Sequence, residues 1–489
     1  MKSPKILCAG FFWIMLQTGP VTGAGTAPAR FLLDQDMEDY EAGNSVGSIV
    51  SQGQTVWVGA SDLSRTDNDG ESWTNINRGR GIGLGGIGAI AVRNDVIWIS
   101  TILDSTTDLG TFDTGGGVGY STDGGLTWTW FPQPVDSVDE TRYKPTTTPI
   151  QNPTYDIALT PSEVWIASWA GGLRRSRDNG QTWQVITVDG LAFDALGQLT
   201  HRAFSIVADG DVLWAGTAGG VHKSSDSGES WITFNHQNQD ESISGNFVVA
   251  LGVQDTPDRH IIWAATVEAL GEDEFRAVSK TEDGGLTWQT MLHGEFAHNF
   301  AFDDSVVYVT TDRGLYKSID YGDTWAVFPQ IRDDRQYREM YTTKIYSALV
   351  DEEEALWVGG ADGLARTADN GLTWTVFRSF PVTEQDGEPG TYAYPNPFSP
   401  MRHNLYDGDG YVRFQYHVSQ ETEVNLKVYD FGMNLVTTVA EGMVRSPGDY
   451  AEVWNGRNDV GDMVANGVYF YQISMRGRDP LWGKVMVVN

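Results

Sequence analysis

The sequence predicts an all-β protein, a seven-bladed β-propeller followed by a small Ig-like β-sandwich. A short phrase that recurs seven times, with an apolar run before each copy, predicts the propeller. Alternating apolar residues near the C-terminus predict the sandwich. We expect a signal peptide over residues 1–24, the propeller over 30–380, a linker over 381–391 and the C-terminal domain over 392–489.

The recurrent phrase is Ser/Thr-x-Asp-x-Gly-x-Ser/Thr-Trp, with Asn in place of Asp in the first copy. Asp and Ser/Thr side chains bond nearby backbone N–H groups, and Gly adopts backbone angles that other residues avoid. The phrase therefore predicts a turn between the third and fourth strands of each blade, which its Trp anchors to the sheet. The Asp or Asn and the Trp of successive copies are Asn68 and Trp73, Asp123 and Trp128, Asp178 and Trp183, Asp226 and Trp231, Asp283 and Trp288, Asp320 and Trp325, and Asp369 and Trp374.

An apolar run with an aromatic residue precedes each phrase, from Val56-Trp57-Val58 to Leu356-Trp357-Val358. These runs predict buried central strands. A short strand before the run, a Gly-Leu-x-Lys/Arg strand after it and a strand beginning at the phrase's Trp complete a four-stranded unit. A sheet repeated about every 40 to 55 residues buries both faces when it packs radially against its copies, which is the β-propeller arrangement.

The phrase resembles the Asp-box, or BNR repeat, of sialidases, xyloglucan-cleaving glycosidases, sortilin-type receptors and photosystem assembly factors. The resemblance covers residues 49–377 and implies the sialidase-like propeller fold. It implies no single activity, because these families share the turn and differ in function. The further sialidase motifs are unsupported. Sialidases carry an N-terminal Arg-Ile-Pro phrase, and the early candidate here, Arg30-Phe31-Leu32, lacks the Ile-Pro. They also need a cluster of arginines for the substrate carboxylate, whereas Arg65, Arg174, Arg175 and Arg366 are expected on third strands beside the turns.

The N-terminus and the charge favour an exported protein. Lys2 and Lys5 precede an apolar stretch over residues 6–16, which predicts a secretory signal peptide and is too short for a membrane span. Cys8, the sole cysteine, lies inside it, so no disulfide is expected after cleavage. The formal charge of −32 disfavours nucleic acid and anionic membranes as partners. We expect a bacterial protein that is secreted or held at the cell surface, with no membrane span.

The C-terminal segment changes character. Val412, Phe414 and Tyr416 alternate with polar residues, as half-buried strands do. About seven short strands predict an Ig-like sandwich. Several segments resemble, in order, the type IX secretion C-terminal sorting domain and the Ig-like domain of flagellar hook-capping proteins: Tyr394-Pro395-Asn396-Pro397-Phe398, residues 424–430, Trp454-Asn455-Gly456-Arg457-Asn458, residues 465–471 and the ending 484–488. The resemblance implies recognition by outer-membrane export machinery. An ordinary accessory sandwich is the alternative.

Long loops point to one face of the propeller. Blades 2 and 5 have extra residues between their second and third strands, at 101–117 and 267–277, and a long connector covers 131–153. Both loop types open opposite the Asp-box turns, where a ligand is expected. Candidate ligand-binding residues are Asp104, Asp108, Asp113, Arg142, Tyr143, Trp169, Glu268, Asp273, Arg276, Arg338, Glu339 and Tyr341, and Glu140 lies beside them. We assign no catalytic residue, no metal site and no cofactor.

Two functions from different classes remain. The first is a non-enzymatic binding or scaffold protein whose loop face engages an extracellular glycan or protein. The alternative is a glycoside hydrolase, sialidase- or xyloglucanase-like, in which one acid protonates the leaving oxygen and a second carboxylate attacks or activates water. Two carboxylates about 5 to 9 Å apart in an aromatic-lined cleft over the central channel favour the enzyme.

Overall fold

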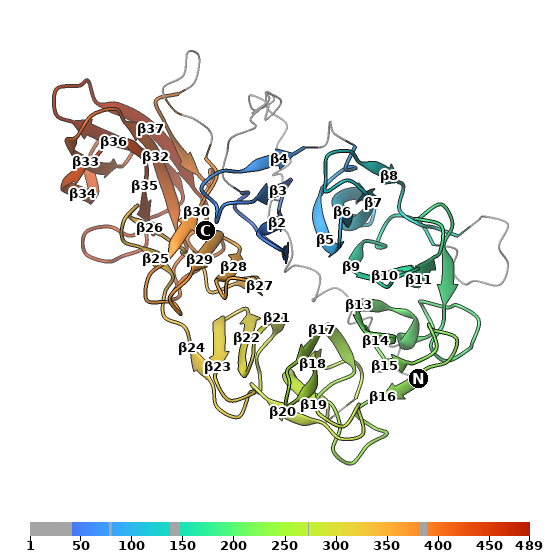
Figure 1. The fold of residues 1–489 in the computed structure, drawn as a ribbon. Coiled ribbons are helices and arrows are strands. Elements are labelled where there is room, and N and C mark those ends of the chain that lie inside the picture. The colour runs from blue at the N-terminus through green and yellow to red at the C-terminus, as the bar shows by residue number, and fades with distance from the viewer. Residues whose placement is uncertain (1–41, 78–80, 137–146, 272, 381–382, 384–388) are drawn as a thin grey trace.

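The computed structural model describes residues 42–77, 81–136, 147–271, 273–380, 383 and 389–489. The expected signal peptide and most of the expected linker lie outside these ranges. The described chain contains seven four-stranded antiparallel sheets of sequential strands, arranged in a ring (Figure 1). This confirms the predicted repeat and the β-propeller arrangement. No helix among the described residues is long and apolar enough to cross a membrane.

Each blade uses four consecutive strands, numbered outward from the centre of the ring. Blades 1 and 2 are β1 (Ser48–Gln52), β2 (Thr55–Gly59), β3 (Leu63–Thr66), β4 (Thr74–Ile76), and β5 (Gly86–Arg93), β6 (Val96–Thr107), β7 (Gly110–Ser121), β8 (Thr129–Phe131). Blades 3 and 4 are β9 (Thr154–Leu159), β10 (Val164–Ser168), β11 (Gly172–Ser176), β12 (Gln184–Ile186), and β13 (Ala203–Asp209), β14 (Val212–Thr217), β15 (Gly220–Ser224), β16 (Ile232–Phe234).

The ring continues through three further blades and one inserted hairpin. Blades 5 and 6 are β17 (Phe247–Asp255), β18 (His260–Val267), β19 (Ala277–Thr281), β20 (Gln289–Met291), and β21 (Ala297–Asp303), β22 (Val306–Thr311), β23 (Gly314–Ser318), β24 (Ala326–Val327). The hairpin β25 (Arg332–Asp333) and β26 (Arg338–Glu339) precedes blade 7, which is β27 (Ile345–Val350), β28 (Leu356–Gly360), β29 (Gly363–Thr367) and β30 (Thr375–Phe377).

The ring closes between blade 7 and blade 1. The innermost strand of each blade contacts that of the next, and β27 contacts β1. Beside this contact the Val46 N–H donates to the Gly360 carbonyl at 3.1 Å. The Asn44 amide donates to the Ser379 carbonyl at 2.7 Å and accepts from its N–H at 2.8 Å. Blade 7 takes all four of its strands from residues 345–377, and residues 29–40 lie outside the described chain.

The turns of the recurrent phrase, called box turns below, join the third and fourth strands as predicted. In blade 4, Ser224 Oγ donates to Asp226 Oδ1 and accepts the Gly228 N–H, both at 2.8 Å. Asp226 also accepts the Ser230 N–H at 2.9 Å and the Ser230 hydroxyl at 2.6 Å. The hydrogen bonds from Ser230, and then that from Ser224, lower the pKa of Asp226 to about 2. In blade 1, Asn68 Oδ1 accepts the Ser72 N–H at 3.0 Å, so Asn also closes the turn.

The box-turn tryptophan contacts the preceding blade, a partner that the expected anchor to the sheet did not specify. Trp231 packs edge-on against Trp165 of blade 3, with ring centroids 6.2 Å apart. The indole leaves the outermost strand and reaches an aromatic ring inside the neighbouring sheet. The other pairs are Trp128 with Trp57, Trp183 with Trp98, Trp288 with Phe234, Trp325 with Trp263, Trp374 with Phe328, and Trp73 with Trp357 and Phe377.

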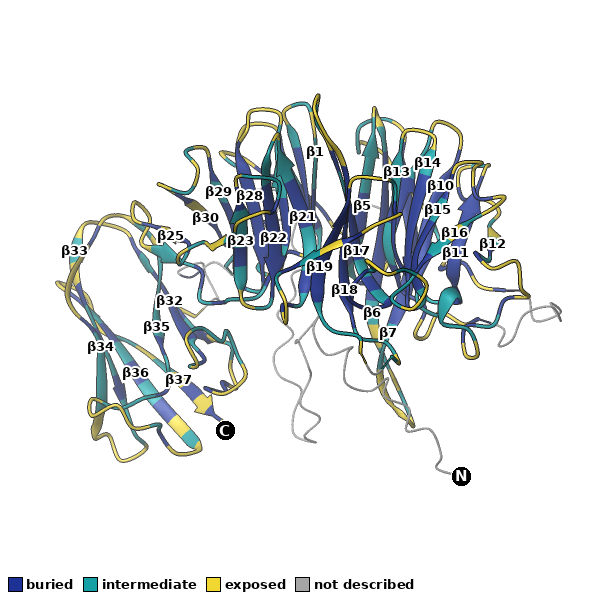
Figure 2. Ribbon diagram, turned by 90° about the horizontal axis from the view of Figure 1, so that it is seen from below, coloured by how far each residue is buried: buried dark blue, intermediate teal, exposed yellow. Residues whose placement is uncertain are grey.

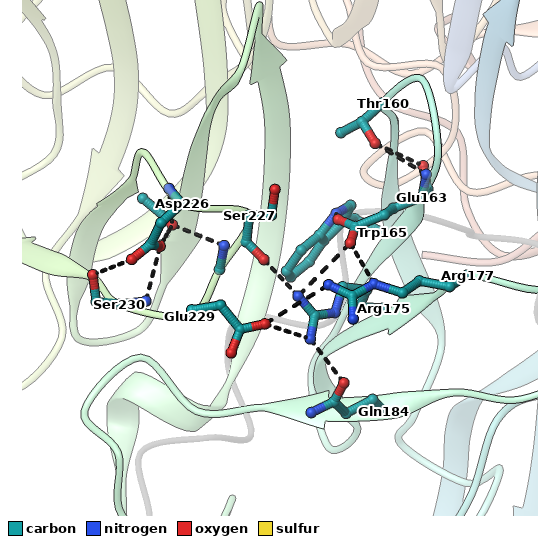
Figure 3. Close-up of polar contacts among 12 residues, drawn as sticks. Thr160, Glu163, Trp165, Arg175, Arg177, Gln184, Asp226, Ser227, Glu229 and Ser230 are labelled. Atoms are coloured by element: carbon teal, nitrogen blue, oxygen red, sulfur yellow. Dashed lines mark hydrogen bonds and ion pairs between the residues drawn. The ribbon is translucent and has the colours of Figure 1, made fainter.

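A cation on the third strand completes the contact between blades. The Arg175 guanidinium lies 5.4 Å from the centre of the Trp165 ring and donates to the Ser227 carbonyl in the next box turn at 2.5 Å (Figure 3). It also pairs with Glu229 at 3.1 Å. Equivalent cations are Arg65 over Trp57, Lys223 over Trp214, Lys280 over Trp263, Lys317 over Tyr308 and Arg366 over Trp357. In blade 2 Tyr120 stacks on Trp98 instead.

The C-terminal segment forms two antiparallel sheets over one core. One sheet has the order β31 (Thr391–Tyr394), β32 (Val412–Val418), β35 (Gly448–Trp454), and the other β34 (Leu435–Arg445), β33 (Thr422–Tyr429), β36 (Gly467–Met475), β37 (Leu481–Val487). Phe414 and Tyr416 of the first sheet and Tyr471 and Ile473 of the second are fully buried in the shared core. The seven strands that the sequence predicts are therefore present.

A buried ion cluster joins this domain to the propeller. Asp362, between β28 and β29, accepts from Arg378 at 3.0 Å and pairs with Arg413 of β32. All three side chains are at most 5% exposed. Beside them the Tyr341 ring packs on Tyr411, with centroids 4.6 Å apart. The C-terminal domain therefore docks against blade 7 and the inserted hairpin.

Two adjacent glycines in the box turn of blade 2 test the contact between blades. Both have positive φ, but a Cβ on Gly125 meets Trp57 Cη2 at 2.4 Å, whereas a Cβ on Gly124 meets nothing within 4 Å. Gly124→Ala should cost about 1 kcal/mol through backbone strain, and Gly125→Ala about 2 kcal/mol more through overpacking. Urea unfolding followed by tryptophan fluorescence measures both. Equal losses in the two variants contradict the proposed close packing.

Candidate functional site

The extra residues of blade 2 extend a hairpin, which corrects the expected loop over 101–117. β6 and β7 stay paired to Thr107 and Gly110, and Asp108 and Leu109 make the turn. The backbone ladder continues to this turn, so the N–H and C=O groups that a loop would leave open are paired within the hairpin. Figure 2 shows this hairpin projecting beyond the strands of the neighbouring blades. The loop face of the propeller therefore carries one long arm.

Two predicted carboxylates meet on this arm. Asp104 and Asp113 are directly opposite in the β6–β7 register. Burial, and then the charge of Asp104, raise the pKa of Asp113 to about 6. Tyr155 lies near this pair. Burial, and then the charge of Asp113, raise the pKa of its phenol well above the usual value. The structure thus brings together an exposed and a half-buried carboxylate beside a half-buried tyrosine whose hydroxyl oxygen is buried.

β-Bulges mark the loop-face end of the innermost strands. In each case one residue is unpaired because the register shifts across it, and a bulge re-aims the side chain of that residue. The bulged residues are Gly88, Tyr155, Phe204, Val249, His298 and Tyr346. Phe204 packs against Tyr155 at 5.9 Å and against Phe247 at 4.3 Å, and His298 packs against Tyr346 at 5.4 Å. Two aromatic clusters therefore lie at this end of the ring.

The residue after a bulge links neighbouring blades. Asp156 Oδ2 accepts the Ser205 hydroxyl and the Ile206 N–H, both at 2.8 Å. Ser205 Oγ in turn accepts the Leu251 N–H at 3.1 Å. Burial raises the pKa of Asp156 to about 6, against these bonds. Asn299 accepts the Ala348 N–H in the same way.

Sequence analysis missed these residues, although a signal was present. Four first strands carry an aromatic residue followed by a polar one: Tyr155-Asp156, Phe204-Ser205, His298-Asn299 and Tyr346-Ser347. Aligning the first strands of the repeats would have exposed that pair, and such a pair does not fit the simple alternation of a regular strand.

The loop of blade 5 is held by Glu274, which was not predicted. Its carboxylate accepts the N–H groups of Ala269 at 2.6 Å and Gly271 at 3.0 Å, and that of Asn246 at 3.0 Å. On the same loop the predicted residues Glu268 and Arg276 form an ion pair at 3.1 Å, and both are about two-fifths exposed. The predicted Asp273 is exposed.

The remaining predicted residues lie in separate places. Trp169 is half-buried under the Arg202 guanidinium, 5.5 Å from the ring centre. Glu140, Arg142 and Tyr143 lie outside the described residues.

Arg338, Glu339 and Tyr341 lie at the contact with the C-terminal domain. The Tyr341 hydroxyl donates to Glu339 at 3.0 Å, and Arg338 donates to the Val376 carbonyl at 3.1 Å. Tyr341, just after the hairpin β25–β26, packs against Tyr411 of the C-terminal domain. Their role in binding a ligand stays a prediction.

The site has chemistry for binding and for acid–base work. Asp104 and Asp113 supply two carboxylates, and the Glu268–Arg276 pair supplies charge of both signs further around the face. Among the residues that the structure describes, no group of three or more His, Cys, Asp or Glu side chains is placed to hold a metal ion.

Comparisons with known proteins show the fold alone. No family model matches the chain, and no curated protein matches it. A GH74 enzyme of Niastella koreensis is 13% identical, with a TM-score of 0.52, over 92% of this chain and 74% of that one. An ancestral GH74 enzyme is 15% identical, with a TM-score of 0.50, over 91% and 63%. PorZ, a surface component of the type-IX secretion system of Porphyromonas gingivalis, is 15% identical over 91% of this chain, with a TM-score of 0.38. The chain spans 66% of the length of PorZ.

Proposed function

We propose that the protein is an exported β-propeller that binds an extracellular glycan or protein at its loop face. The observation that carries the proposal is the β6–β7 arm. It projects from the face and ends in Leu109, which is 89% exposed, beside the exposed Asp108. A strand pair that extends this far beyond the sheet buries little of its own surface, so that surface is available for contact with a partner. Loops on a rigid scaffold are where binding residues concentrate.

Export and sorting belong to the same proposal. The expected signal peptide takes the chain out of the cytoplasm, and the C-terminal domain is an Ig-like type IX sorting domain that directs it across the outer membrane. Support comes from the resemblance over residues 392–489, whose segments fall on β33, β36 and β37 and at the ends of β31 and β35. The protein then remains at the cell surface or is released.

A glycoside hydrolase is the second candidate, favoured by one observation. Asp113, with its pKa near 6, faces Asp104 across the hairpin. A carboxyl group whose pKa is raised can serve as the acid, while a neighbouring carboxylate serves as the base or nucleophile. In this reading Asp113 protonates the leaving oxygen and Asp104 acts on the sugar or on water.

Exposed leucines on opposite faces test the binding proposal. Leu109→Asp should weaken binding at least tenfold on a glycan array and on an array of extracellular proteins, because it puts a charge at the tip of the arm. Leu372→Asp is the matched control, since Leu372 is 86% exposed on a box turn at the other face. Equal binding by both variants and the wild type excludes the arm as the site.

Asp113→Asn tests the hydrolase. If the candidate is right, the wild-type protein turns over chromogenic glycosides, and activity falls as the pH rises through about 6, because the acid loses its proton. The variant should then lose roughly 100-fold or more. Absence of turnover across a broad glycoside panel removes this candidate and leaves the binding proposal intact.

The sorting proposal is tested by expression in two hosts. In a bacterium with a type IX system, the full chain should reach the cell surface or the medium, and a chain that ends at residue 380 should accumulate in the periplasm. A host without that system should retain both. Surface delivery of the truncated chain shows that the C-terminal domain is not the signal.

A further inference from the structure

The outer face of sheet β34-β33-β36-β37 carries exposed aromatic side chains. Alternation along β33 and β36 places Val424, Leu426, Val428, Tyr471 and Ile473 inward, where all are fully buried. The residues between them point outward, together with their neighbours on β37 and in the turn after β33. This surface, called the aromatic face, consists of Lys427, Tyr429, Phe431, Val468, Phe470, Gln472, Trp482, Lys484 and Met486.

Strand register arranges the aromatic face in rows. One row runs from Lys427 through Gln472 to Trp482, and the next from Tyr429 through Phe470 to Lys484. Each of these rows thus joins aromatic rings to side chains that can hydrogen-bond. The Tyr429 and Trp482 rings lie 5.8 Å apart, and those of Phe431 and Phe470 6.2 Å apart. Phe431 is 79% exposed and Trp482 is 48% exposed.

The propeller leaves this face open. The domain contact uses Arg413 and Tyr411 on the β32 side, with Arg445 reaching Tyr337 from the end of β34. Figure 2 shows β32 and β35 between the propeller and strands β34 and β36. A partner can therefore reach the aromatic face while the two domains stay docked.

Charge and chemistry select the partner. Exposed rings offer flat apolar surfaces, and the ammonium and amide groups of Lys427, Lys484 and Gln472 offer hydrogen bonds to hydroxyl groups. A sugar unit presents both, an apolar C–H face and a rim of hydroxyls. The net charge of −32 repels polyanions, and the two lysines of the face repel polycations, so the fitting polymer carries no charge of its own. We propose that the aromatic face binds a neutral polysaccharide chain, independently of the propeller's loop face.

Affinity electrophoresis of the full chain tests this site. Native gels that contain neutral polysaccharides, namely xyloglucan, mixed-linkage β-glucan, mannan or dextran, should retard the wild-type protein in at least one case. A gel with polygalacturonate should not. Trp482→Ala and Tyr429→Ala should each weaken retardation at least tenfold, because both remove a stacking ring. Val444→Ala is the control, since Val444 is 64% exposed on β34 at the far end of the same sheet.

Three outcomes overturn the proposal. The first is that no neutral polysaccharide retards the protein, and the second is that Trp482→Ala, folded by near-UV circular dichroism, binds like the wild type. The third is a concentration-dependent dimer in sedimentation that Trp482→Ala abolishes, which makes the face a contact between two copies. Leu109→Asp should bind normally in these gels, so failure of the propeller site and failure of this one are distinguishable.

Discussion

Contact between a box-turn tryptophan and an aromatic ring of the preceding blade holds each blade to its neighbour. In blade 3 the Trp165 ring contacts the Arg175 guanidinium and also the Gly228 and Trp231 of the next box turn. Burial of one indole is worth roughly 4 to 6 kcal/mol as an upper estimate, and the cation adds about 0.5 to 2 kcal/mol. Because the box turn of blade 1 clasps Trp357 of blade 7, the same contact that joins neighbours also closes the ring.

The fold was predictable because its signals are local. A box turn lies within eight residues of sequence, so Asp226, Gly228 and Ser230 specify it wherever the chain goes next. The partner of Trp231 was not predictable from the phrase. Trp165 lies in another repeat, and the residues of one repeat do not indicate which residues of another they contact. The same limit applies to Arg175, which sequence analysis placed on a third strand without assigning it the next box turn as a partner.

In the candidate site too, contacts between residues close in sequence were predictable, and contacts between distant residues were not. Asp104 and Asp113 were expected on one face, and hairpin register places them opposite each other, because the two positions are close in sequence. Their surroundings were wrongly expected to be a loop, since Thr, Ser, Gly and Asp are frequent in turns and only pairing with a matching strand makes them extended. The partners of Tyr341 were not predictable, because Tyr411 and Arg413 lie far along the chain in the C-terminal domain.

The buried cluster around Asp362 makes the two domains separable at little electrostatic cost to the propeller. Asp362 and Arg378 both belong to the propeller and pair at 3.0 Å, whereas Arg413 comes from the C-terminal domain. If the domain departs, Asp362 keeps its cation and Arg413 enters water, so no buried charge is left alone. A contact built with Asp362 and Arg413 as the sole pair would leave an unpaired buried carboxylate on the propeller. Asp362 therefore has a cationic partner within the propeller whether or not the C-terminal domain is docked.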